Sequence, residues 1–382
     1  MKYIDEFRTG DVARIIADKI ISESDPGRTY HFMEFCGGHT HAIARFGIVD
    51  LLPGNIRMIH GPGCPVCVLP IGRVENAIQL AQMPQSILCC YGDVLRIPAS
   101  NGMSLLKAKA QGADVRMIYS SADAIDIARQ NPQHQVVFFA IGFETTTPPT
   151  AIAIKQAQQL GLKNFSVFCN HVLTPSAISH ILQSPEVRQL GLVAIDGFIG
   201  PAHVSVVIGS QPYDYFAEEF QKPVVIAGFE PLDVMQAILM LIRQVNSKRA
   251  VVENEFTRAV LPQGNTKAQS LVADVFELRR TFEWRGLGVV PYSALRIKSC
   301  YADFDAEQRF QISTPVIADN KACECGAILR GVKQPQDCKI FGSVCTPDNP
   351  VGSCMVSSEG ACAAHYRYGR FRQHRAAIAV NQ

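Results

Sequence analysis

The chain has 382 residues, and its 36 Lys and Arg balance 34 Asp and Glu to a formal net charge of +2. Such a balance provides no basic field and no acidic tail, so we expect no nucleic-acid partner. With 47% hydrophobic and 18% charged residues, the composition is typical of an ordered globular protein of two or three domains. The longest apolar stretch, 234–242, has nine residues, whereas about 20 are needed to span a bilayer. We therefore expect no membrane segment and, because the N-terminus shows no secretory signal, a cytoplasmic protein.

Short apolar runs alternate with amphipathic stretches from residue 29 to about 246, which is the pattern of β-loop-α units. In chain order, the predicted strands are 30–35, 56–60, 87–91, 115–119, 136–141, 165–169, 192–195 and 224–227. Helices are predicted after most of them, including 74–81, 122–129, 151–160 and 232–245. Because strands and helices alternate, the predicted fold class is α/β with mostly parallel sheets.

A weak internal repeat suggests how the chain is divided: Gly-Phe-Glu follows a predicted strand at 142–144 and again at 228–230. We interpret this repeat as a sign of two similar α/β lobes, which we place at 29–130 and 131–246. Beyond residue 247 the β-loop-α pattern stops and a cysteine-rich region follows. We therefore predict a third, C-terminal iron-sulfur domain made of 1–28 and 247–382.

The loops after the first two predicted strands carry thiols, and loops at the carboxyl ends of parallel strands face the ligand crevice. Cys36 follows the first strand, and Cys64 and Cys67 follow the second within GPGCPVC. Predicted helix N-termini at both loops would lower the pKa of these thiols. We interpret Cys64 and Cys67 as a redox dithiol, with half a zinc site or two inert thiols as alternatives. Cys36 is predicted to be a functional thiol, although a buried cysteine also acts as a small hydrophobe.

Two histidines lie beside Cys36 in the sequence CGGHTH. His39 and His41 are candidate ligands or proton carriers, because imidazole binds metals and titrates near neutral pH. The alternative for each is an imidazole that only hydrogen-bonds a loop.

The C-terminal region carries the strongest indication of a metal site in the sequence. Six of the 13 cysteines lie between 323 and 362, namely Cys323, Cys325, Cys338, Cys345, Cys354 and Cys362. In a reducing cytoplasm such thiols are ligands more often than disulfides. Four thiolates suit zinc or an iron-sulfur cluster. Structural zinc sites usually use paired CxxC knuckles, whereas these cysteines are spread singly, so a [4Fe-4S] cluster is favoured and zinc is the alternative.

Several of these motifs, in this order, resemble the HypD family of [NiFe]-hydrogenase maturation factors. They are CGGHTH at 36–41, GPGCPVC at 61–67, GFETTTP at 142–148, PAHVS at 201–205, GFEP at 228–231, EWRGLG at 283–288, and CGAIL, CTP and MVSSEGAC near the C-terminus. Ala202 departs from the pattern, because Gly is expected there.

The resemblance implies a scaffold on which the Fe(CN)2CO unit is assembled, and not an ordinary turnover enzyme. Cys36, Cys64 and Cys67 would be the thiols at which this iron is handled. The implied [4Fe-4S] ligands are Cys325, Cys338, Cys345 and Cys362, with Cys323 and Cys354 as spares. The implied partners are a HypC-type small chaperone and the cyanide donor HypE, with HypF as a candidate companion. We expect a monomer that forms heterocomplexes.

Two other classes of protein fit parts of the same pattern. A cubane-linked thiol-disulfide oxidoreductase would also combine CxxC with a cluster, but would turn over protein disulfides. A zinc-stabilised binding module would need neither redox chemistry nor iron.

Overall fold

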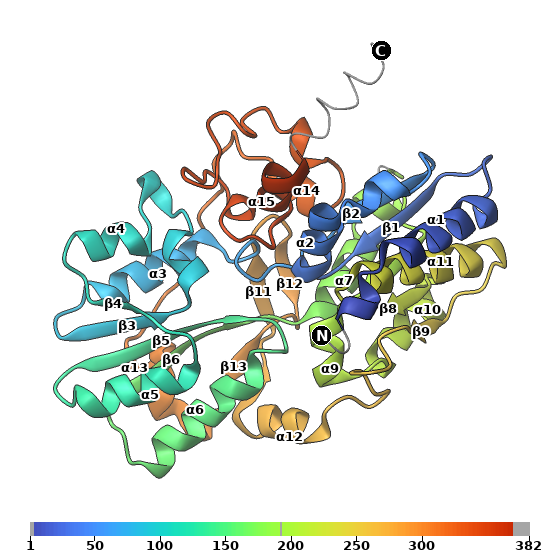
Figure 1. Ribbon diagram of the computed structural model, residues 1–382. Coiled ribbons are helices and arrows are strands. Elements are labelled where there is room, and N and C mark those ends of the chain that lie inside the picture. Colours follow the sequence, from blue (N-terminus) through green and yellow to red (C-terminus); the bar gives the residue numbers. More distant parts are fainter. Residues whose placement is uncertain (1–3, 192, 370–382) are drawn as a thin grey trace.

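The computed structural model describes residues 4–191 and 193–369 and is built around two parallel β-sheets (Figure 1). We call the five-stranded sheet, of order β2-β1-β7-β8-β9, sheet A, and the four-stranded sheet, of order β4-β3-β5-β6, sheet B. Sheet A contains β1 (Tyr30–Glu34), β2 (Ile56–His60), β7 (Gly197–Gly200), β8 (Val224–Ile226) and β9 (Val252–Asn254). Sheet B contains β3 (Ser86–Cys90), β4 (Val115–Met117), β5 (Gln135–Gly142) and β6 (Phe165–His171). All pairings within both sheets are parallel, which confirms the α/β prediction with two lobes.

Helices precede or connect the strands of both sheets. Those before or between strands of sheet A are α1 (Gly10–Glu23), α2 (Gly37–Phe46), α9 (Ala202–Ile208), α10 (Asp214–Phe220) and α11 (Pro231–Asn246). The connections that lead into and through sheet B contain α3 (Ile71–Ala81), α4 (Leu105–Ala110), α5 (Ser121–Gln130) and α6 (Thr147–Gln159), and the return to sheet A contains α7 (Thr174–Gln183) and α8 (Pro185–Arg188). Short 3-10 helices lie at Asp5–Phe7, Ile48–Leu51, Gly92–Arg96, Ser100–Gly102, Gln211–Tyr213, Ser299–Phe304, Pro335–Asp337 and Ser353–Met355.

The C-terminal part has smaller elements. They are α12 (Thr266–Val275), β10 (Phe276–Leu278), β11 (Thr281–Trp284), β12 (Gly288–Pro291), β13 (Leu295–Ile297), α13 (Ala306–Arg309), α14 (Cys325–Leu329), α15 (Ala361–Ala364) and a π-helix at His365–Gly369. Strands β10 and β13 pair antiparallel, as do β11 and β12. In Figure 1 the red C-terminal segment with α14 and α15 lies above the junction of the two lobes.

The local sequence explains why these elements form. Strand β5 is buried along nearly its whole length, and its run of β-branched and aromatic residues suits a strand covered on both faces. Helix α5 begins with a capping box between Ser120 and Asp123, which satisfies backbone donors at the helix start. Among the described residues, no helix has both the length and the apolar character to cross a membrane.

The sheets divide the chain differently from the predicted boundary near residue 130. The chain leaves sheet A after β2, builds the whole of sheet B, and then returns for β7, β8 and β9. The lobes 29–130 and 131–246 are therefore wrong, because β1 hydrogen-bonds β7, a strand more than 160 residues away, in a register that pairs Phe32 with Gly197. The repeated Gly-Phe-Glu loops do mark one loop in each lobe, after β5 and after β8.

The predicted third domain is also divided in the structure. Helix α1 packs against α11 beside sheet A, so the described N-terminal residues 4–28 belong with sheet A. Strand β9 pairs with β8, and β13 packs on β6, so much of 247–310 completes the two lobes. Leu192, inside the predicted strand 192–195, lies outside the described residues, and the strand of this region is β7, further along the chain.

Candidate functional site

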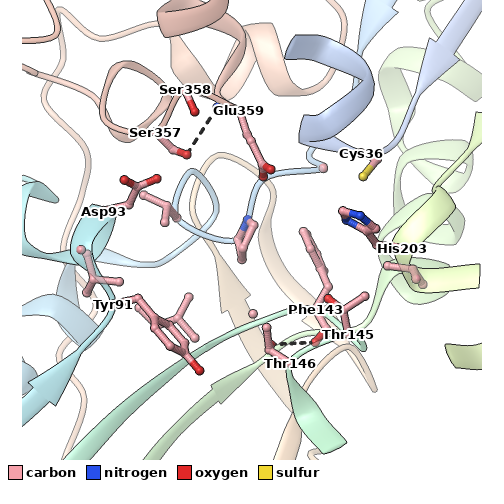
Figure 2. Close-up of a pocket in the computed structure, with 18 residues that line it drawn as sticks. Cys36, Tyr91, Asp93, Phe143, Thr145, Thr146, His203, Ser357, Ser358 and Glu359 are labelled. Carbon is pink, nitrogen blue, oxygen red and sulfur yellow. Dashed lines mark hydrogen bonds between the residues drawn. The ribbon is translucent and has the colours of Figure 1, made fainter. Parts of the chain in front are cut away.

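A cavity of 430 Å³ lies where the two lobes meet the C-terminal region (Figure 2). Sheet A contributes the loops after β1, β2 and β7, sheet B contributes the loops after β3 and β5, and residues 357–359 line the remaining wall. The strand order reverses between β1 and β7 in sheet A and between β3 and β5 in sheet B. Ligands bind at such switch points in open α/β sheets. Both switch points face this one cavity, which makes it the candidate site.

Cys36 lines the cavity and directly precedes α2. Its backbone N–H donates to Glu34 Oε2 at 3.0 Å. The fully buried Glu34 carboxylate also accepts a hydrogen bond from the Thr40 hydroxyl and lies 2.8 Å from His60 Nδ1. A buried carboxylate with several donors is rigid. The Glu34 contacts therefore fix the backbone that carries the Cys36 thiol.

The environment of the Cys36 thiol favours its neutral form. Burial raises its pKa, and the nearby carboxylates of Glu359 and Glu34 raise the pKa further. A metal cation reverses this preference, because its charge stabilises the thiolate and a coordinating thiol releases its proton. The expected effect of the α2 N-terminus, a lowered pKa, is outweighed here by burial.

Cys64 and Cys67 form a disulfide in the structure, with Cα atoms 5.2 Å apart. Both are buried, and the two residues between them line the cavity. The loop packs closely on Cys36, because a Cβ atom on Gly63 would lie 2.4 Å from the Cys36 backbone nitrogen. The structure thus brings the three predicted thiols of the two loops together. Their redox role stays a prediction.

The disulfide loop, residues 61–67, directly contacts the cysteine-rich segment, residues 323–362. The Ser353 hydroxyl donates a 2.6 Å hydrogen bond to the backbone oxygen of Cys67. Ser353 is fully buried, and the next residue along the chain is Cys354. The sequence gives no sign of this contact, because the two residues are 286 positions apart.

His39 is buried and does not line the cavity. Its Nε2 lies 3.0 Å from the backbone oxygens of both Ala227 and Gly228, so this nitrogen carries the proton, and its ring packs 4.8 Å from the Phe229 ring. Burial lowers the pKa of His39, which keeps the imidazole neutral. These contacts tie the loop after β1 to the loop after β8. A role as ligand or proton carrier stays a prediction.

His41 lies on the other side of α2, toward the C-terminal region. Its Nδ1 is 3.3 Å from the backbone oxygen of Ser358, and its ring packs edge-on against Tyr368. His41 therefore contacts a loop that lines the cavity without lining the cavity itself.

Sequence reasoning did not select His203 as a site residue, yet it lines the cavity after β7, the neighbour of β1. Its ring packs edge-on against Phe229 with centroids 4.4 Å apart. Its partial burial lowers its pKa. The available signal was its position after a strand, but the partner of that strand was not known from sequence.

Two carboxylates were also missed. Asp93 follows β3, and Glu359 comes from the C-terminal segment; both line the cavity. Burial raises the pKa of Glu359, and the charge of Asp93 raises that pKa further. The side chain of Glu359 packs against Gly37, where a Cβ atom would lie only 2.5 Å from the Glu359 Cβ. This contact explains one of the two glycines after Cys36.

The C-terminal cysteines gather in one region. The thiols of Cys325, Cys354 and Cys362 lie close enough to shift one another's pKa, and those of Cys323 and Cys325 do the same. Gly352 makes room for them, since a Cβ atom there would lie 2.4 Å and 2.6 Å from the sulfurs of Cys323 and Cys325. Of the predicted ligands, Cys325 and Cys362 therefore share one contact group, together with the two spares.

The other two predicted ligands lie beside this group. The charges of Cys323 and Cys338 contribute to the raised pKa of Cys345, after the larger effect of burial. Within residues 4–191 and 193–369, no three His, Cys, Asp or Glu side chains are arranged as a complete metal-binding group. The donor set itself fits a thiolate-bound centre, because the side chains that share this contact group are all thiols.

Fold and site together define a two-lobed α/β protein whose central cavity is lined by one thiol and by the two residues between a pair of disulfide-bonded cysteines. The chain matches the family model HypD, described as "Hydrogenase formation hypA family", over residues 11–369. Hydrogenase maturation factor HypD of Cupriavidus necator is 68% identical over 372 residues, which cover 97% of this chain and 98% of that protein.

Other relatives carry the same name. Hydrogenase maturation factor HypD of Escherichia coli (strain K12) is 43% identical over 373 residues, which cover 96% of this chain and 98% of that protein. The relative from Rhizobium leguminosarum bv. viciae is 68% identical over 373 residues, which cover 98% of this chain and 97% of that protein. The chain belongs to the HypD family and has a role in hydrogenase maturation.

Proposed function

We propose that this protein is the scaffold on which the Fe(CN)2CO unit of [NiFe]-hydrogenase is assembled, with the iron as cargo held at Cys36. The observation that carries the proposal is that Cys36 and the loop of the Cys64–Cys67 disulfide line one cavity, and that the cysteine-rich segment hydrogen-bonds this loop. Family membership supplies the link to hydrogenase maturation. The protein acts as an assembly site and not as an ordinary turnover enzyme.

In this proposal the thiol of Cys36 binds the iron together with a cysteine of a HypC-type small chaperone. Thiolates are soft donors, and they suit an iron that also accepts strong-field diatomic ligands. The position of Cys36 on the cavity wall gives a partner's cysteine a place to meet the same iron. HypE, acting with HypF, is the proposed cyanide donor. The chain itself is proposed to be a monomer within such heterocomplexes.

The Cys64–Cys67 pair is the proposed electron store. In the reduced state it holds two thiols, and closing the S–S bond releases two electrons and two protons to the assembly reaction. The closed form is the one in this structure. The close approach of Gly63 to Cys36 supports the pairing of this redox step with the iron site.

The C-terminal region is the proposed site of a [4Fe-4S] cluster. Cys325, Cys338, Cys345 and Cys362 would hold it, and a cubane of this kind supplies one-electron transfer. Support comes from the all-sulfur donor set and from the buried hydrogen bond between Ser353 and the Cys67 backbone. This bond makes the cysteine-rich segment and the disulfide loop direct neighbours.

Infrared and Mössbauer spectra of anaerobically purified protein, alone and with the HypC-type chaperone, test the proposal. We expect bands from iron-bound CO and cyanide and the signal of a cubane. Disulfide turnover with a cubane but no such bands would favour the thiol-disulfide oxidoreductase, for which the disulfide is the supporting observation. A colourless zinc protein would favour the binding module.

A further inference from the structure

The cavity wall near Cys36 carries two polar side chains whose hydrogen-bonding groups are unused. Thr145 and His203 both line the cavity, and neither has a hydrogen-bond partner within the part of the chain that the structure describes. In Figure 2 both are drawn on the same side of the cavity as Cys36, whereas Tyr91 and Asp93 lie on the opposite side.

Thr145 is the first of three consecutive threonines, and its hydroxyl differs from the other two in having no hydrogen-bond partner among the described residues. The neighbouring hydroxyls are engaged by the local backbone: Thr146 donates to the oxygen of Phe143 at 3.1 Å, and Thr147 to that of Glu144 at 2.8 Å. These two bonds build the turn into α6 in the manner usual for helix starts. Thr145 takes no part in that turn, so its hydroxyl remains available to a molecule in the cavity.

His203 is held in place without the use of its ring nitrogens. Its ring packs edge-on against Phe229, and Phe229 in turn packs against His39. Gly38 allows this packing, because a Cβ atom there would lie 2.5 Å from the Phe229 ring. The imidazole is therefore oriented by packing, which is the arrangement that preorganises a donor for a ligand.

The rest of the wall differs in character. Apolar side chains of Val66, Ile141 and Phe143 line part of the cavity, and the carboxyl groups of Asp93 and Glu359 line another part. Metal-bound cyanide keeps negative charge and a lone pair at its nitrogen, so it seeks hydrogen-bond donors and avoids carboxylates. Carbon monoxide bound to iron accepts hydrogen bonds poorly and tolerates an apolar wall.

We propose that Thr145 and His203 form a hydrogen-bonding subsite that receives the cyanide ligands of the iron cargo, whereas the carbonyl ligand faces the apolar wall. This inference rests on the proposed scaffold function and adds what that function leaves open, namely which residues distinguish the two kinds of diatomic ligand. Both residues act on the ligands of the iron and not on the iron itself.

The test compares the infrared bands of matched variants purified anaerobically with the HypC-type chaperone. In Thr145→Val and His203→Leu the cyanide bands should move to lower wavenumber with a smaller change in the carbonyl band, because hydrogen bonds at the cyanide nitrogen stiffen its triple bond. A lost hydrogen bond to a charged group, about 1.5–3 kcal/mol, also predicts roughly 10- to 150-fold faster loss of the cargo. Thr145→Ser and His203→Gln, which keep a donor, should stay near wild type.

Thr146→Val is the matched control, because Thr146 lines the same cavity but gives its hydroxyl to the Phe143 backbone. Its bands should keep the wild-type positions. Unshifted bands and unchanged cargo retention in Thr145→Val and His203→Leu, with native circular dichroism, would overturn the subsite while leaving the scaffold intact. Wild-type protein without carbonyl and cyanide bands would overturn the scaffold function and the subsite with it.

Discussion

Replacing Ser353 by Ala removes a buried hydrogen bond by which the cysteine-rich segment holds the backbone of the disulfide loop. The bond is 2.6 Å long, and the side chain is fully buried, so water cannot replace the lost donor. Leaving the Cys67 carbonyl without a partner costs about 1–3 kcal/mol. At a urea dependence of roughly 3 kcal/mol per M, the unfolding midpoint should fall by about 0.3–1 M.

Ser358→Ala is the control for this prediction, because it deletes the same hydroxyl from the same segment. Ser358 is exposed, and its hydroxyl has no hydrogen-bond partner among the residues described here, so its effect should stay within about 0.5 kcal/mol. Hydrogen exchange should show faster opening of residues 64–68 in Ser353→Ala only. Equal urea midpoints and equal exchange in the two variants would refute the proposed joint between the cysteine-rich segment and the disulfide loop.

Three further predictions concern other parts of the molecule. Burial raises the pKa of Glu144 from 4.5 to about 7, so the folded state binds the carboxyl proton more tightly than the unfolded state does. The stability that this proton contributes is therefore full below pH 4.5 and is lost as the pH rises through about 7. The free energy of unfolding of the wild type should therefore fall by about 3 kcal/mol between pH 4.5 and pH 7, and Glu144→Gln should remove this fall. Urea unfolding at both pH values measures it. A variant whose free energy of unfolding falls as much as that of the wild type would contradict the assignment. Replacing Cys338 or Cys345 by Ala should remove iron and sulfide from the C-terminal region; full contents in both variants would reject them as cluster ligands. His39→Leu should lower the free energy of unfolding by about 1–3 kcal/mol, because two loop carbonyls lose their donor, and an unchanged urea midpoint would argue against this role.

The sequence predicted local elements better than their assembly. Strand β2 and helix α5 were placed within a residue or two, because apolar runs and capping residues determine them locally. The division into lobes failed because strand pairing is a long-range property: β1 pairs with β7, and no local pattern encodes that partner. The strand near 192–195 was misplaced because the short, glycine-bounded β7 has little periodicity of its own.

The site shows the same limit. Cys36, Cys64 and Cys67 could be selected because thiols in glycine-rich loops are chemically conspicuous. His203, Asp93 and Glu359 could not be selected, because each is an ordinary polar residue until folding places it on the cavity wall. Only strand order and the packing of the C-terminal segment supply that information.

The central claim is that Cys36 retains the iron cargo, and Cys36→Ala tests it most directly. The substitution removes one sulfur at the edge of a cavity and little packing, so the fold and the cubane absorbance should persist. Infrared spectra of the anaerobic complex with the HypC-type chaperone should then show the carbonyl and cyanide bands in wild type and none in the variant. Bands of wild-type intensity in Cys36→Ala would place the iron elsewhere and contradict the account.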